Sequence, residues 1–178
     1  MTVGAGGSGF QSNRSLDAWG WLIMPTLLCL IATVVQDIAF RFFTFSLPEV
    51  VWPLIPAFAW AVVRPAILPP ILLFGMGVFV DLWTGGPMGL WPVALLAAYA
   101  SVFLTRSVMA GQSALAMWVW YAAACLFAFV VADFLTMLDS LNTPNYLAVF
   151  WQFLVTAALF PLANRLIARY EDADVRFR

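Results

Sequence analysis

The fold is decided by residues 66–106, which read AILPPILLFGMGVFVDLWTGGPMGLWPVALLAAYASVFLTR. This stretch contains two apolar runs, at about 66–83 and 88–106, and its charged residues are Asp81 and Arg106. About 20 apolar residues in a helix cross a bilayer core about 30 Å thick, so each run is expected to form one membrane crossing. Between the runs, Gly85-Gly86-Pro87 is a strong turn signal, because glycine adopts positive φ without strain and proline starts a helix well. The stretch therefore predicts a helical hairpin in a membrane.

The composition extends this prediction to the whole chain. The 178 residues are 64% hydrophobic and 10% charged, whereas a soluble domain has roughly 25% charged residues. Eight arginines and nine acidic residues cannot cover a water-soluble surface for a chain of this size, so the remaining surface is expected to face lipid. This excludes a soluble enzyme, a disordered chain and a nucleic-acid binder, which would need a basic patch.

The residue types that are missing from the chain exclude most kinds of catalytic and metal-binding site. The chain has no His and no Lys, so it lacks imidazole metal ligands, histidine-based catalytic pairs and the lysine of a nucleotide-binding glycine loop. Cys29 and Cys125 both lie in apolar runs, where a thiol behaves as a small hydrophobic group. We therefore predict no catalytic residue, no metal site and no cofactor.

Six apolar runs follow one another along the chain, at about 18–38, 47–63, 66–83, 88–106, 113–138 and 145–168. They predict an all-α bundle of six transmembrane helices over residues 18–168, between a flexible cytoplasmic segment at 1–17 and a cytoplasmic tail at 169–178. The run from Leu47 to Val63 contains Glu49, Pro53 and Pro56, so it is predicted to be either a short, kinked crossing or a re-entrant segment. Prolines within the runs are expected to kink their helices.

The arginines predict the orientation of the bundle. With six crossings and both termini in the cytoplasm, Arg41 alone falls on the outer side of the membrane. The other seven arginines fall on the cytoplasmic side, as the positive-inside rule requires; they are Arg14, Arg64, Arg106, Arg165, Arg169, Arg176 and Arg178.

Three acidic residues fall at the outer ends of the odd-numbered helices, namely Asp37, Asp81 and Asp133. Three carboxylates at one depth could form an outward-facing cation or proton site. Alternatively, each carboxylate accepts hydrogen bonds from nearby loop amides, because an acid at a helix carboxyl end needs local donors. We favour the second interpretation, since no other type of ligand accompanies the acids.

The segment around Asp81 is the most distinctive motif of the chain. Gly75 and Gly77 allow close backbone approach between membrane helices, and Asp81 is well placed to bind amides of the following turn. We therefore expect a tight structural hairpin rather than a ligand site. Its motif residues are Gly75, Gly77, Asp81, Gly85, Gly86, Pro87 and Gly89.

The pattern of residues 48–106 resembles the rod-shape-determining protein MreD family. The residues that carry this resemblance are Pro48, Trp60, Arg64-Pro65, Gly75, Asp81-Leu82, Thr84-Gly85, Pro87-Met88-Gly89 and Ala98-Tyr99. The last apolar run is also similar to the family's last span, through Phe150-Trp151, Phe160-Pro161-Leu162, Arg165 and Arg169. The second helix departs from the pattern in holding two prolines.

The resemblance implies a non-enzymatic component of the cell-elongation machinery in the bacterial inner membrane. Its expected partner is MreC, and through MreC it would help to couple MreB filaments to peptidoglycan synthesis by RodA and a class B penicillin-binding protein. The implied fold is similar to that of the six-helix substrate-binding subunits of energy-coupling-factor vitamin transporters. The alternative function is therefore a transport component that binds a small substrate in an outward-facing cavity near the three aspartates.

Overall fold

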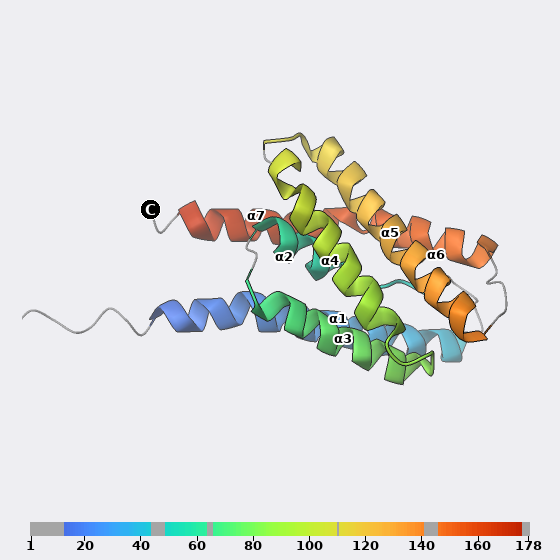
Figure 1. The fold of residues 1–178 in the computed structure, drawn as a ribbon. Helices are drawn as coiled ribbons and strands as arrows, with labels where there is room; N and C mark the ends of the chain where they lie inside the picture. Colours follow the sequence, from blue (N-terminus) through green and yellow to red (C-terminus); the bar gives the residue numbers. More distant parts are fainter. Residues whose placement is uncertain (1–12, 44–48, 64–65, 110, 141–145, 176–178) are drawn as a thin grey trace, which may run out of the picture.

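The computed structural model describes residues 13–43, 49–63, 66–109, 111–140 and 146–175. These residues form α-helices and connecting turns, with no β-strand among them. The helices in chain order are α1 (Asn13–Phe43), α2 (Leu54–Val63), α3 (Leu68–Thr84), α4 (Leu90–Met109), α5 (Ala114–Ser140), α6 (Tyr146–Ala158) and α7 (Phe160–Val175) (Figure 1). The helices α1 and α7 extend beyond the predicted boundaries at residues 18 and 168, whereas residues 1–12 and 176–178 of the predicted flanking segments lie outside the described part.

The two ends of the bundle are distinguished by the parts of the chain that lie there. The start of α1 and the end of α7 lie together at one end, which we call the terminal end (Figure 1). The turn between α3 and α4 lies at the opposite end, which we call the hairpin end (Figure 1). Arg14 in the first turn of α1 and Arg106 in the last turn of α4 belong to the terminal end, whereas Arg41 in the last turn of α1 belongs to the hairpin end. Arg64, Arg176 and Arg178 lie outside the described residues, and the side of the membrane that each end faces stays a prediction.

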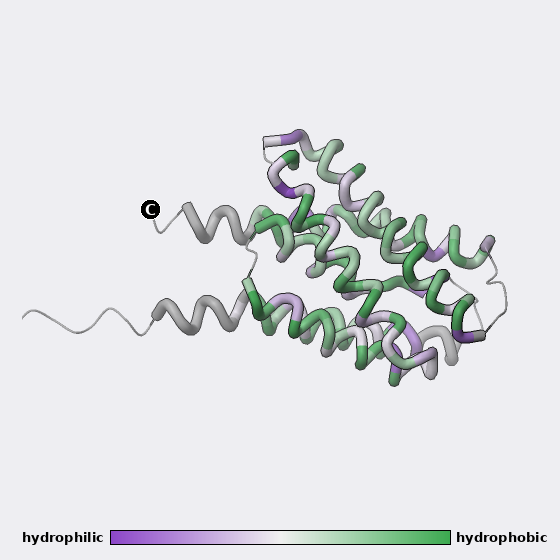
Figure 2. The backbone as a smooth tube through the Cα atoms, in the orientation of Figure 1, coloured by the Kyte–Doolittle hydropathy of each residue, from purple (hydrophilic) through white to green (hydrophobic). Residues whose placement is uncertain are grey.

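Three helical segments are long and apolar enough to cross a membrane: Leu90–Met109, Ala114–Asp139 and Tyr146–Ala168. Three further apolar helices are shorter, at Leu22–Ile38, Leu54–Val63 and Leu68–Thr84. Large apolar side chains stay exposed on the outside of the bundle, for example Ile67, Leu104 and Leu115 at 83%, 77% and 76%, and apolar residues follow the helices along their length (Figure 2). Exposed apolar surface of this extent is typical of a lipid-facing protein rather than a soluble one. Of the six predicted crossings, three correspond to helical segments of full spanning length, so an all-helical membrane protein is confirmed but a bundle of six crossings is not.

The second apolar run does not form a regular helix. The helix α2 begins only at Leu54, and its 10 residues would span about 15 Å at 1.5 Å per residue. Eight of these residues, from Leu54 to Ala61, are buried, because α4 and α7 pack against this short helix. Figure 1 shows α2 inside the bundle rather than on its perimeter. The run is therefore a non-helical segment followed by a short core helix.

Side chains of neighbouring helices bind two backbone groups of the non-helical residues before α2. The Val51 amide donates to Thr156 Oγ1 of α6 at 3.5 Å, and the Cys29 thiol of α1 donates to the Trp52 carbonyl at 3.5 Å. The Trp52 indole nitrogen also donates to Gln36 Oε1 of α1 at 2.7 Å. Unpaired backbone groups are costly away from water, so these contacts make an interrupted helix tolerable inside the bundle.

Most prolines begin helices instead of bending them, which corrects the predicted kinks. Pro56 and Pro92 lie in the first turns of α2 and α4, and Pro69 and Pro70 lie in the first turn of α3. The first turn has no intrahelical acceptor for its amides, so a missing N–H costs nothing there. Pro25 differs from these prolines because it lies in the interior of a described helix, α1.

Pro161 divides the sixth apolar run into α6 and α7. Its ring nitrogen cannot donate to the Ala157 carbonyl, and the Trp118 indole nitrogen of α5 donates to that carbonyl at 3.1 Å instead. The Tyr121 hydroxyl of α5 donates to the neighbouring Thr156 carbonyl at 3.2 Å. Two side chains of α5 therefore cover the carbonyls at the break.

Candidate functional site

The carboxylate of Asp81 joins α3 to the start of α4. Asp81 is 2% exposed, and its Oδ2 and Oδ1 atoms accept hydrogen bonds from the amides of Gly89 at 2.7 Å and Trp91 at 3.0 Å. The first amides of a helix have no intrahelical acceptor, and a carboxylate there also interacts favourably with the helix dipole. Asp81 thus caps α4 from the last turns of α3, which closes the hairpin.

The glycines of the motif have separate structural roles. Gly85 ends α3 with φ of 71°, and its amide donates to the Asp81 carbonyl at 3.0 Å. Gly89 has φ of 96° just before α4, and both glycines adopt a backbone conformation that other residues rarely take. Gly86 and Pro87 complete the turn, and the Leu90 amide donates to the Pro87 carbonyl at 3.3 Å.

Gly77 is the point of closest approach between α3 and α4. A Cβ atom at this position would lie 2.4 Å from the Pro92 nitrogen and 2.8 Å from the Trp91 carbonyl carbon. By contrast, a Cβ atom at Gly75 would have no heavy atom within 4 Å. The predicted close approach therefore occurs at Gly77 and does not occur at Gly75, because Gly75 lies on an exposed face of α3.

The three aspartates of the predicted outer cluster do not share one site. Asp81 is directed into the start of α4, and Asp37 of α1 lines a pocket from which Asp81 and Asp133 are absent. Asp133 belongs to α5, and no residue of α5 lines the pocket, whose walls come from α1, α3, α4, α6 and residues 49–53. The spacings of 44 and 52 residues along the chain do not bring the three carboxylates together in this pocket.

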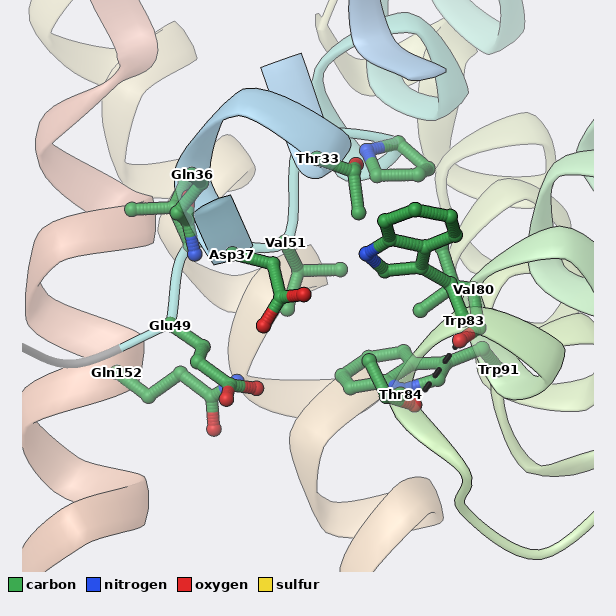
Figure 3. A pocket seen from close by; sticks show the side chains of 12 residues that line it. Thr33, Gln36, Asp37, Glu49, Val51, Val80, Trp83, Thr84, Trp91 and Gln152 are labelled. Atoms are coloured by element: carbon green, nitrogen blue, oxygen red, sulfur yellow. Dashed lines mark hydrogen bonds between the residues drawn. The ribbon is translucent and has the colours of Figure 1, made fainter. Parts of the chain in front are cut away.

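The pocket at the hairpin end contains Asp37 together with polar residues that the sequence analysis did not assign to a site, namely Thr33, Gln36, Glu49, Thr84 and Gln152. Its volume is about 40 Å³. Side chains from five segments converge on it, and Figure 3 shows the carboxylates of Asp37 and Glu49 directed toward its interior. It is lined by Thr33, Gln36, Asp37, Glu49, Val50, Val51, Pro53, Val80, Trp83, Thr84, Trp91 and Gln152. The signal that could have found it is the presence of two glutamines, Gln36 and Gln152, within otherwise apolar runs.

Metal-ligating side chains do not gather at one place in the described part of the chain. They include no group of three or more His, Cys, Asp or Glu residues that could hold a metal ion. Both cysteines are buried and free. The arrangement can hold helices together at Asp81 and Gly77, and it offers one small polar pocket.

No family model, curated protein or solved structure matches this chain. The resemblance to MreD and the fold similarity to vitamin-transporter subunits therefore stay predictions from the residues.

Proposed function

We propose that this chain is a non-enzymatic membrane scaffold of the bacterial cell-elongation complex, related to MreD. In this role it binds MreC and helps to couple MreB filaments to peptidoglycan synthesis by RodA and a class B penicillin-binding protein. The observation that carries the proposal is the geometry of the motif that most resembles MreD. Both carboxylate oxygens of Asp81 are hydrogen bonded to backbone amides, so the motif's acid is used to fix two helices rather than to bind a substrate.

The proposed topology has six crossings of the inner membrane, with both termini in the cytoplasm. It is supported by three segments of full spanning length and three shorter apolar helices. It is also supported by Arg14 and Arg106 at the terminal end, because basic residues concentrate on the cytoplasmic side of membrane proteins. In this topology the hairpin end faces outward.

Pocket sizes favour the scaffold over the transport component. Pockets that enclose small-molecule ligands typically measure about 300–1,000 Å³, whereas the pocket at the hairpin end has a volume of about 40 Å³. A second cavity, of about 130 Å³, lies between α4 and α5 and is lined mainly by apolar side chains such as Val102, Met109 and Phe127. Neither volume suits a vitamin-sized substrate.

Co-purification tests the proposal directly. The tagged full chain is expressed with MreC from the same genome, extracted in mild detergent and isolated through the tag. We expect MreC to be retained in a defined ratio, whereas an unrelated polytopic membrane protein with the same tag retains none. If the chain stays helical and monodisperse but never retains MreC, the scaffold proposal is wrong.

A further inference from the structure

The carboxylate of Asp133 differs from that of Asp81 in having no hydrogen-bond donor beside it. Two backbone amides bind the Asp81 carboxylate, whereas the described residues give the half-buried Asp133 neither a hydrogen bond nor an ion pair. The predicted bonds from nearby amides thus occur at Asp81, and the described part of the chain supplies none to Asp133.

Asp133 lies within the apolar part of α5 rather than at the end of this helix. It lies six residues before the end of the spanning segment Ala114–Asp139, which corresponds to about 9 Å at 1.5 Å per residue. Exposed apolar side chains surround it along the helix, at Val130, Phe134 and Leu138. The short side chain of an aspartate cannot extend its charge to water as a long Lys or Arg side chain does. Ionisable groups in such positions are usually paired, so Asp133 needs a donor that α5 does not supply.

The outward face of α5 has the spacing of a helix-packing surface. Residues that alternate three and four positions apart face one neighbouring helix in left-handed packing, which is common in membrane bundles. Six residues of α5 follow this spacing, and we call them the α5 seam: Val119, Ala123, Leu126, Val130, Asp133 and Met137. The first four are exposed and the last two are half-buried, and none of the six belongs to the core of the bundle. Figure 1 shows α5 at an edge of the bundle, so the seam is open to a further helix.

The charge of Asp133 distinguishes between the occupants that can cover the α5 seam. Lipid chains offer the carboxylate no hydrogen-bond donor. A second copy of this chain has the same orientation in the membrane, so a symmetric contact through the seam would place Asp133 against Asp133, and like charges repel. A helix with a basic side chain at the matching depth fits both the spacing of the seam and the charge of its acid, because hydrogen bonds between charged groups are strong.

We propose that the α5 seam docks one transmembrane helix of a partner protein, whose Arg or Lys side chain pairs with the Asp133 carboxylate. A polar residue at one position of a helix-packing surface fixes the partner and its register, so Asp133 selects the helix that binds. The chemistry of the partner follows from the seam, and only the identification of the partner as MreC rests on the proposed function.

Binding is tested with the purified full chain in vesicles of zwitterionic lipid and a synthetic transmembrane helix of Leu and Ala, about 22 residues long. One peptide carries a single Arg at the depth of Asp133, and a control peptide carries Leu there. Energy transfer between a dye on the chain and a dye on the peptide measures binding as the mole fraction of peptide rises. We expect the parent chain to bind the Arg peptide at least tenfold more tightly than the Leu peptide. Equal binding of the two peptides, or saturable binding of neither, would overturn the proposal.

Substitutions at Asp133 show whether this preference comes from its carboxylate. Asp133→Leu should abolish the preference, whereas Asp139→Asn, which removes an acid of α5 outside the seam, should keep it. Asp133→Arg should prefer a peptide with Glu in place of the Arg by at least tenfold, a gain that misfolding cannot produce. If Asp133→Leu still prefers the Arg peptide, the cation binds elsewhere and the proposal is wrong.

A matched pair of valine substitutions locates the surface that the peptide covers. Val130→Trp adds bulk to the seam and should weaken binding of the Arg peptide at least tenfold. Val93→Trp makes the same change at an exposed position of α4 and should leave binding unchanged. Unchanged binding by Val130→Trp would show that the peptide does not lie on the α5 seam.

Co-purification separates the seam from the proposed function. We expect Asp133→Leu to retain at least tenfold less MreC than Asp139→Asn does. If the Arg peptide binds through Asp133 but neither the parent chain nor any variant retains MreC, the seam stands and the MreC scaffold fails. If Asp133→Leu retains MreC fully, MreC does not dock on the seam, and that half of the inference is overturned.

Discussion

The α3–α4 hairpin and the segment from residue 49 to Val63 are both interrupted by prolines, but they are stabilised in different ways. In the hairpin, Asp81 binds amides only eight and ten residues further along the chain. In the second segment, Val51 binds a hydroxyl 105 residues away, at Thr156. A turn that is closed by local contacts can be recognised from sequence, whereas an interruption held by distant helices cannot.

The largest expected effect is that of removing the Asp81 carboxylate. Asp81→Ala leaves the Gly89 and Trp91 amides without their acceptor in a buried site, and each hydrogen bond to a charged group contributes about 1.5–3 kcal/mol. We expect a loss of about 3–5 kcal/mol in the free energy of unfolding, measured by SDS titration in mixed micelles. Asp81→Asn retains one acceptor oxygen and should lose less. If Asp81→Ala is fully stable yet inactive in cell elongation, the residue belongs to an interface or ligand site instead.

A matched pair of glycine substitutions separates the packed face of α3 from its exposed face. Gly77→Ala places a Cβ atom against the backbone of Trp91 and Pro92, so α4 must shift, and overpacking of this kind costs about 1–3 kcal/mol. Gly75→Ala meets no neighbour and should stabilise the helix by about 0.5–1 kcal/mol. The same SDS titration measures both variants. Equal effects at the two positions would contradict the helix contact described for Gly77.

Thr156→Val tests the long-range contact of the second segment. The substitution keeps the side-chain shape and removes the oxygen that accepts the hydrogen bond of the Val51 amide. Because Thr156 is buried, no water takes the place of that oxygen. Because this bond is long, at 3.5 Å, we expect a loss of about 1 kcal/mol. The control is Thr105→Val, whose hydroxyl donates to carbonyls of its own helix α4, and it should lose less than about 0.5 kcal/mol. A larger loss for Thr105→Val than for Thr156→Val would contradict the contact.

The smallest effect is expected at the α6–α7 break. Trp118→Phe removes the indole donor to the Ala157 carbonyl, and the half-exposed position reduces the expected loss to about 0.5–1 kcal/mol. Trp151→Phe, at another exposed tryptophan, is the matched control and should change stability by less than about 0.5 kcal/mol. Identical values for the two variants would show that Trp118 does not stabilise the break.

The sequence predicted the features that depend on residues close together in the chain. Composition and apolar runs were sufficient for the helical membrane fold, and the glycines and Asp81 located the hairpin. The pair Trp52-Pro53 indicated that α2 begins late, because the residue before a proline avoids the helical conformation. The two glutamines hinted at polar positions inside the bundle but not at a pocket, since Gln36 of α1, Gln152 of α6 and Glu49 of the non-helical segment line one pocket only after these parts pack. For the same reason the sequence could not show that Asp133 of α5 does not line this pocket.

The central claim is that α4 crosses the membrane, so that the α3–α4 turn and the α4–α5 turn lie on opposite sides. The most direct test is to introduce one cysteine in each turn and to measure its labelling by a maleimide. The native Cys29 and Cys125 are buried, so they contribute little background. An impermeant maleimide applied to intact cells should label Gly86→Cys and should label Ser113→Cys only after the membrane is permeabilised. Labelling of both positions from the same side would contradict a bundle in which α4 crosses the membrane.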